Sequence, residues 1–431
     1  MADELTAGAA SSADTRALLR HRPFGLYIAA RGCSEFAYQI SAVAVGWQIY
    51  ALTGNAFDLG LAGLLEFLPT ALFIFVAGHA ADRFDRRRVA QACQLVSGGA
   101  LAALGVATFA HWVTLPMIFA AILTLGIAGA FESPAVSALL PAVTPRGLLQ
   151  RGTAVSTGVF QIAMISGPAV GGFAYAAVPA LPYAIAAALS LLAALLNGLI
   201  STPLRVADPE APSGSSLFAG VAFVRNNPAI LGTISLDLFA VLLGGATALL
   251  PIYARDILHT GPMGLGVLRA APAVGALLMS AVLARHALQR RVGVRMFQAV
   301  IVFGLATVVF ALSRSMWLSV GALVILGAAD TVSMVIRIAL VQLRTPDDMR
   351  GRVGAVNYLF VNASNQLGAF ESGTLAGFIG AMPAAFVGGI GTVLIALLWM
   401  RLFPTLRDVE RLEGAASALD AAAQPSTQTT V

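Results

Sequence analysis

Nine charged side chains lie inside long apolar stretches of the sequence. The chemistry that such side chains could perform there is proton exchange. They are Arg31, Glu35, Glu66, Glu132, Asp237, Arg269, Asp330, Arg337 and Glu371. At the centre of a lipid bilayer a charge costs about 3 kcal/mol or more unless it faces water or a partner. A carboxylate near an arginine can gain or lose a proton when its surroundings change, because burial disfavours the ionised form and the arginine favours it. These residue types therefore predict a central polar cavity that handles protons.

Glu35 is the first candidate for proton coupling, with Arg31 as the partner that tunes it. The two residues are four positions apart, so they share one face of a helix and can pair. Glu35 also lies near the middle of its apolar run. Asp330 is the second candidate, and Arg337 follows it two turns later on the same face. For both carboxylates, a static ion pair that holds helices together is the alternative.

The other charges and several aromatic residues predict a substrate cavity. A flat or apolar ligand would contact aromatic rings, although each ring could instead face lipid or core. Glu132 and Glu371 border the expected cavity and could equally serve packing. The residues expected to line it are Glu66, Arg269, Asp237, Arg337, Tyr38, Phe239 and Tyr358.

Catalytic chemistry is not expected. The chain has no lysine, so it lacks the lysine of a nucleotide-binding loop and of a Ser-x-x-Lys pair. Its five histidines are scattered, and none has metal-ligand spacing. Cys33 and Cys93 fall inside apolar runs, where a buried thiol is expected rather than a disulfide. We therefore expect no enzyme, no metal and no cofactor.

The elements that must position these charges are membrane-spanning helices. Hydrophobic residues make up 58% of the 431 residues and charged residues only 11%, against roughly 25% charged in soluble domains. The apolar runs are too long for barrel strands, so an all-α integral membrane protein is indicated. Twelve spans are predicted, near 24–50, 57–81, 89–111, 114–140, 153–177, 180–200, 228–253, 263–284, 294–312, 316–341, 353–380 and 383–403.

These spans form two sets of six with polar segments around them. Residues 1–23 show no signal peptide and are expected to form a cytoplasmic segment before a retained first span. The predicted domains are bundles at 24–203 and 228–404, a linker at 204–227 with a short amphipathic helix, and a disordered cytoplasmic tail at 405–431.

Arginine placement predicts the topology. Of the 26 basic residues, all arginine, 21 fall in the termini and in the loops assigned to the cytoplasm. Only Arg255 and Arg314 fall in outer loops. The positive-inside rule then places both termini in the cytoplasm. A sequence pI near 9.7 reports this topology, so nucleic-acid binding is not expected.

The two halves resemble each other. Residues 125–145 align without a gap with 326–346, and the tripeptide at 49–51 recurs at 252–254. Glu66-x-x-Pro69 aligns in the same way with Arg269-x-x-Pro272. Two agreeing offsets favour duplication of a six-helix unit, which is the plan of major facilitator transporters.

The stretch GHAADRFDRRR at 78–88 resembles the most characteristic motif of the major facilitator superfamily, the cytoplasmic loop between helices 2 and 3. The alternative is that any cytoplasmic end of a span attracts arginines. The resemblance implies a gate contact that closes the cytoplasmic side and breaks when the carrier turns inward. Asp85 stands where the family usually has glycine, so a different turn is expected there. The residues that match this gate motif are Gly78, Asp82, Arg83, Arg86 and Arg87.

Two further resemblances favour a branch of this superfamily. The stretch SGPAVGG at 166–172 resembles the antiporter motif of drug exporters, with Gly167, Pro168, Gly171 and Gly172, although a glycine-rich packing seam is the alternative. The segments 237–258, 264–278 and 364–378 resemble a drug:proton antiporter branch that contains the enterobactin exporter and macrolide and multidrug efflux pumps.

Together these features predict a secondary active transporter of the inner membrane. It would export an amphipathic small molecule of the drug or siderophore class by proton antiport, with rocker-switch alternating access. The expected partners are the substrate, protons and membrane lipid, and the chain is expected to act as a monomer. A lysophospholipid-type flippase, an uncoupled facilitator and, less favoured, a non-transporting receptor or scaffold are the alternatives.

Overall fold

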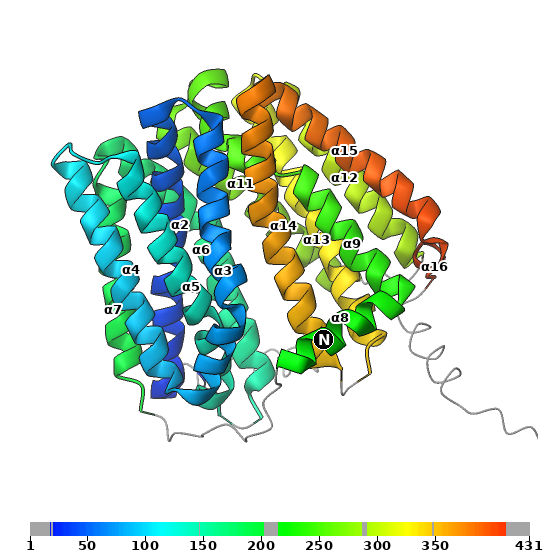
Figure 1. The fold of residues 1–431 in the computed structure, drawn as a ribbon, viewed down its shortest axis with the longest axis horizontal. Helices are drawn as coiled ribbons and strands as arrows, with labels where there is room; N and C mark the ends of the chain where they lie inside the picture. The colour runs from blue at the N-terminus through cyan, green and yellow to red at the C-terminus, as the bar shows by residue number, and fades with distance from the viewer. Residues whose placement is uncertain are drawn as a thin grey trace, which may run out of the picture. The chain divides into compact units, whose positions relative to one another are not determined.

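The computed structural model describes residues 18, 20–145, 147–201, 214–286, 291–346 and 349–410. Within these ranges the protein is built from helices and contains no β-strand (Figure 1). The predicted all-α fold class is therefore confirmed for the described part of the chain. The expected linker at 204–227 is described only from residue 214, and most of the tail lies outside the described residues.

The first six helices are long and follow one another through short loops. They are α2 (Arg22–Thr53), α3 (Ala56–Arg83), α4 (Arg86–Phe109), α5 (Leu115–Val143), α6 (Leu149–Ala177) and α7 (Leu181–Gly198). Helix starts follow capping chemistry. The Asn55 side chain accepts a hydrogen bond from the backbone N–H of Phe57, and prolines occupy the first turns of α2, α5 and α7.

The later elements include one interrupted span. They are α8 (Gly214–Asn226), α9 (Pro228–Leu243), the 3₁₀ helix η1 (Ala246–Leu249), α10 (Leu250–Ile252), the π-helix η2 (Tyr253–Ile257), α11 (Gly261–Arg285), α12 (Val292–Leu312), α13 (Met316–Leu343), α14 (Arg350–Ile379), α15 (Ala381–Leu402) and α16 (Pro404–Arg407).

Ten helical segments of the described chain are long and apolar enough to cross a membrane, counting Pro228–Ile257 as one segment. Two other helices, α2 and α14, have 32 and 30 residues and carry more polar side chains. At 1.5 Å per residue each exceeds the roughly 30 Å of a hydrocarbon core. With these two, the long helices agree in number with the twelve predicted spans.

Packing divides the chain into two compact units. The first contains the described residues of Met1–Ala211 together with Leu250–Ala270, and the second those of Pro212–Leu249 and Ala271–Val431. Leu250–Ala270 thus packs with the first unit, although the sequence prediction assigns it to the second bundle.

In the first unit α2 is the central helix, in contact with α5, α6 and α7. Its polar side chains help to hold it there. Gln48 donates to the hydroxyl of Thr108 on α4 at 3.0 Å, and the hydroxyl of Tyr183 on α7 donates to Gln48 at 2.5 Å. All three side chains are buried, and a fully bonded polar network of this kind specifies one arrangement of the three helices.

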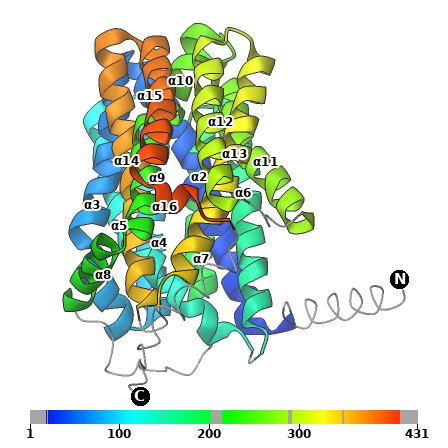
Figure 2. The same cartoon turned by 90° about the vertical axis from the view of Figure 1, so that its right-hand side faces the viewer.

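In the second unit α9 contacts α13, α14 and α15, and α12 packs between α13 and α15 (Figure 2). Its apolar core gathers Leu236, Phe297, Ile336 and Leu340 from three of these helices. The sequence predicts one continuous span at 228–253, but α9 ends at Leu243 and the chain continues through η1, α10 and η2. Glycine lowers helix propensity, and the α9 helix stops at the Gly-Gly pair that follows Leu243.

Candidate functional site

The first unit contains two carboxylates and one arginine on α2 and α5. The Nη2 atom of Arg31 lies 3.6 Å from Oε1 of Glu35, which bears out the pairing expected from their spacing. The Ser34 hydroxyl, between them in sequence, donates to Oε1 of Glu132 at 2.6 Å. Arg31 and Glu35 side chains are 22% and 24% exposed, and the Nε atom of Arg31 is buried without a hydrogen-bond partner among the described residues. The arginine is therefore only loosely held by Glu35.

Glu132 is fixed more firmly than Glu35. In addition to Ser34, the Gln94 amide donates to Oε1 of Glu132 at 2.9 Å, and the Asn197 amide donates to Gln94 at 2.9 Å. Gln94 and Asn197 are 1% and 2% exposed, so the chain of amides runs through the core from α7 to α4 to α5. The sequence prediction assigned Glu132 equally to a cavity or to a packing role. No sequence pattern could show that it contacts α2 and α4.

A second polar cluster of the first unit involves Tyr38, Glu66 and Arg269. The Tyr38 hydroxyl donates to Oε1 of Glu66 at 2.5 Å, and Arg269 donates from Nη1 to the carbonyl of Ala42 at 3.0 Å. Tyr38 and Ala42 lie one turn apart on α2, so α2 holds a residue of α3 and a residue of α11 close together. Tyr38 is 47% exposed, and a phenol with an exposed face next to a carboxylate can contact a ligand.

The second unit also contains two carboxylates and one arginine on two helices, α9 and α13. The carboxylate of Asp237 and the guanidinium of Arg337 form an ion pair, and these residues are only 8% and 5% exposed. The sequence places Arg337 on the same face as Asp330, but in the structure Arg337 pairs with Asp237 on another helix. Burial of both charges makes this pair costly to break by removing one partner.

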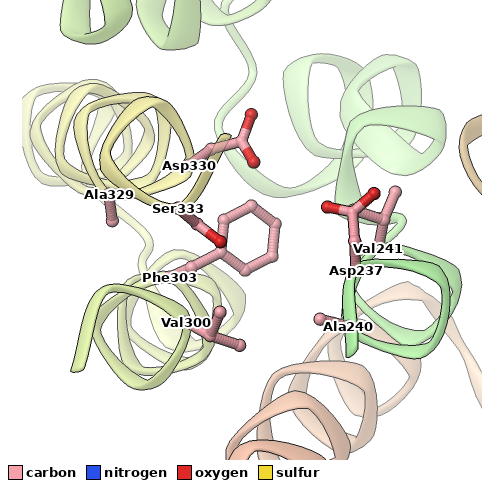
Figure 3. A pocket seen from close by; sticks show the side chains of 8 residues that line it. All are labelled: Asp237, Ala240, Val241, Val300, Phe303, Ala329, Asp330 and Ser333. Atoms are coloured by element: carbon pink, nitrogen blue, oxygen red, sulfur yellow. The ribbon is translucent and has the colours of Figure 1, made fainter. Parts of the chain in front are cut away.

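Asp330 and Asp237 face the same cavity (Figure 3). The cavity has a volume of about 10 Å³, which is room for about one water molecule. Its wall also includes the hydroxyl of Ser333 and the ring of Phe303. Among the described residues the carboxylate of Asp330 makes no hydrogen bond or ion pair. The site thus has one carboxylate that is paired with an arginine and one that has no ionic partner among the described residues.

The aromatic candidates of this unit lie away from the cavity or outside the described part of the chain. Phe239 packs its ring against Trp399, with centroids 5.3 Å apart, and is absent from the cavity wall. The side chain of Tyr358 is not among those that the structure describes.

The arginine-rich loop between α3 and α4 is hydrogen-bonded to neighbouring helix ends of the first unit. Asp85 is the N-cap of α4 and accepts from the backbone N–H of Arg87, while the Arg87 guanidinium donates to both carboxylate oxygens at 3.1 and 2.7 Å. Arg87 also donates to the carbonyl of Ile200, and Arg86 to the carbonyl of Ala138 at 3.1 Å.

These contacts explain the departure from the family motif at Asp85. The hydrogen bonds from Arg87 hold the pKa of the Asp85 carboxyl below its usual value. Arg83 is exposed at the end of α3, and a side chain added at Gly78 would meet no described atom within 4 Å. The side chain of Asp82 lies outside the described part of the chain, so its gate role stays a prediction.

The glycines of the 166–172 stretch permit close helix packing. A Cβ atom at Gly167 would lie 2.6 Å from Cβ of Gln39, and one at Gly171 would lie 2.8 Å from the carbonyl oxygen of Ile40. One at Gly172 would lie 2.5 Å from the carbonyl oxygen of Pro262. Together with Pro168, these residues form the face of α6 that meets α2 and the segment Leu250–Ala270.

Sequence reasoning missed a third cluster of the first unit. The Tyr50 hydroxyl donates to Asp256, the Arg255 guanidinium donates to the carbonyl of Tyr50 at 2.7 Å, and it lies 5.3 Å from the centroid of the Tyr50 ring. Arg255 and Asp256 read as ordinary loop charges in the sequence. The signal available was the recurrence of Ile-Tyr-Ala at 49–51 and 252–254, next to both partners.

Acid and base side chains inside membrane-spanning helices are typical of membrane transporters. The model of the Major Facilitator Superfamily matches residues 28–369, and the chain belongs to this superfamily. It is therefore a transporter and not an enzyme.

Particular relatives are efflux proteins. The chain is 28% identical over 384 residues to the multidrug efflux pump Tap of Mycobacterium tuberculosis, which covers 86% of this chain and 91% of that protein. It is 28% identical over 401 residues to the enterobactin exporter EntS of Citrobacter koseri, covering 90% and 94%. These similarities support the expectation of efflux from an inner membrane, as a multi-pass protein.

Solved structures share the fold. The nucleoside transporter NupG superimposes with a TM-score of 0.69 at 15% identity, covering 88% of this chain and 99% of that chain. A bacterial homologue of the human lysosomal transporter Spinster, in an inward-facing and occupied conformation, gives a TM-score of 0.70 at 14% identity, covering 89% and 97%.

Proposed function

We propose that this protein exports an amphipathic small molecule of the drug or siderophore class in exchange for protons, by rocker-switch alternating access. The observation that carries the proposal is the placement of Arg31, Glu35 and Glu132 within the first unit's membrane-spanning helices. A carboxylate that shares an arginine with a second carboxylate can exchange a proton without leaving a buried charge alone. The efflux function of the relatives Tap and EntS supports the substrate class.

Glu35 is the proton-coupling residue of this proposal and Arg31 is its tuning partner. Among the described residues Glu35 forms one ion pair, with Arg31 at 3.6 Å, whereas Glu132 accepts two hydrogen bonds. Tyr38, Glu66 and Arg269 form the adjoining substrate-contact surface on the same unit. A substrate that binds while Glu35 is ionised and leaves when it is protonated would be exchanged for a proton.

The test is transport in proteoliposomes with an imposed pH gradient, using a panel of dyes, macrolides and catecholate siderophores. Native protein is compared with Glu35→Gln and with Glu410→Gln, a matched change of an exposed carboxylate beyond the spans. Size-exclusion profiles establish that each variant is folded. We expect gradient-driven movement in the native protein and in Glu410→Gln, and its loss in Glu35→Gln.

Other results would redirect the proposal. Movement that ignores both the gradient and Glu35→Gln would contradict proton coupling and favour a facilitator. If no compound moves, the assay is repeated with fluorescent lysophospholipid, and flipping of that lipid would replace the export proposal. A chain that moves neither would be a receptor or scaffold on the carrier fold.

A further inference from the structure

We infer that the protein exchanges two protons, one in each unit, on Glu35 and on Asp330. The inference rests on the proposed proton coupling and extends it to the number of coupling sites. Each unit contains a buried or half-buried group of two carboxylates and one arginine, and each group lies on the first and fourth long helices of its half of the sequence.

The group in the first unit is Arg31, Glu35 and Glu132. With all three ionised, it carries a net charge of one negative unit. Glu132 receives hydrogen bonds from Ser34 and Gln94, which stabilise its ionised form. Glu35 receives none from the described residues and lies 3.6 Å from Arg31. Glu35 is therefore the carboxylate that neutralises the group by taking one proton.

The group in the second unit is Arg337, Asp237 and Asp330, again with a net charge of one negative unit. The ion pair with Arg337 keeps Asp237 ionised. Asp330 faces the cavity across from Asp237 and forms no hydrogen bond or ion pair with the described residues (Figure 3). A bare carboxylate in an apolar wall is neutralised by a proton rather than kept charged. Asp330 is therefore the proton carrier of this unit.

The two groups lie at equivalent helix crossings. The offset that aligns 49–51 with 252–254 places Ser34 over Asp237, and the offset that aligns 125–145 with 326–346 places Glu132 over Ser333. Ser34 contacts Glu132 between α2 and α5, and Asp237 contacts Arg337, one turn beyond Ser333, between α9 and α13. The two crossings therefore correspond in the duplication, although the contacts differ: a Ser–Glu hydrogen bond in the first unit and an Asp–Arg ion pair in the second.

The ionisable neighbours of each proton carrier are known from the packing. Around Glu35 they are Arg31, Glu132 and the phenol of Tyr38. Around Asp330 the ionisable group is Asp237, from the facing wall of the cavity, while Arg337 lies two turns further along the Asp330 helix and pairs with Asp237. Each carrier thus has a second carboxylate nearby, whereas only Glu35 lies within ion-pair distance of an arginine, so the two carriers are expected to titrate at different pH values.

Two protons would change what the exporter can accumulate. With the membrane potential clamped at zero, a tenfold proton gradient supports about a tenfold substrate gradient for one coupled proton and about a hundredfold gradient for two.

Infrared difference spectroscopy of the full-length protein in liposomes tests the inference without any substrate. The carbonyl stretch of protonated carboxylic acids is recorded as the pH is stepped. We expect Glu35→Gln and Asp330→Asn each to remove about half of the titrating intensity from buried acids and the double variant to remove nearly all of it. Glu371→Gln is the matched control within the spans, because Glu371 accepts from Ser372 at 3.3 Å and is not in the cavity wall.

The outcomes separate the inference from the proposed function. If one variant removes all of the intensity, or if Glu371→Gln removes half, the two-site inference is wrong even when transport is proton-coupled. If both sites titrate as expected and no proton-driven export is found, the proposed function fails and the two sites stand. Should Asp330→Asn not fold, Asp330→Glu must retain the second titration with a displaced midpoint.

Discussion

The ion pair between Asp237 and Arg337 gives the sharpest prediction for stability. Asp237→Leu removes one partner of a pair in which the two residues are 8% and 5% exposed. The guanidinium is then left in the protein interior with its Nε atom already unpartnered among the described residues. Asp330 lies on the same helix as Arg337 and lines the same cavity as Asp237. Its carboxylate is therefore the group that could partly compensate the arginine.

The expected loss of unfolding free energy follows from this burial. Breaking a buried pair by removing one partner costs about 3 to 5 kcal/mol. Because Asp330 can partly compensate Arg337, we expect about 3 kcal/mol for Asp237→Leu alone and about 5 kcal/mol when Asp330→Asn is also present. The apolar double variant Asp237→Leu with Arg337→Leu should lie within about 1 kcal/mol of the native protein, since neither charge is then orphaned.

Reversible unfolding in bicelles, followed by steric trapping, measures these differences. A double-mutant cycle on Asp237 and Arg337 should show a coupling free energy of at least about 2 kcal/mol. Additive costs in the cycle, or a single-variant cost below about 1 kcal/mol, would refute the reasoning that both charges are desolvated.

The remaining predictions concern the loop before α4 and the glycine face of α6. Asp85→Ala should cost about 1 to 2 kcal/mol in the same assay, because it removes the N-cap and both Arg87 contacts, whereas Asp85→Asn should retain the cap. The pKa of Asp85 is lower in the folded protein than in the unfolded chain. The stabilising effect of Asp85 should therefore be full above about pH 4 and disappear as the pH falls through the folded pKa. A pH-independent effect of Asp85→Ala would contradict this. Gly171→Ala should lower the unfolding free energy by about 1 to 3 kcal/mol because its Cβ would lie 2.8 Å from a backbone oxygen. Gly99→Ala, with no atom within 4 Å of its Cβ, should leave the protein as stable or make it more stable. Equal effects of the two variants would argue against the close packing of α6 on α2.

The sequence by itself determined the fold class and the positions of the spans. Apolar runs long enough to cross a bilayer can satisfy their backbone groups only as helices, so the predicted ranges agree with the helices of the structure to within a few residues, except at 228–253, where α9 ends at Leu243. Local spacing also predicted the contact between Arg31 and Glu35, since residues four apart on a helix are neighbours whatever the tertiary packing.

Contacts between distant helices could be decided only by the tertiary structure. Arg337 pairs with Asp237, a hundred positions away, and Glu132 is bonded to Ser34 and Gln94, because helix rotation and crossing determine which side chains meet. Charged residues inside spans indicate that polar partners exist. The helical repeat of 3.6 residues, however, determines which side chains are neighbours only along one helix. Which carboxylate pairs with an arginine and which has no ionic partner among the described residues is therefore a property of packing and not of spacing.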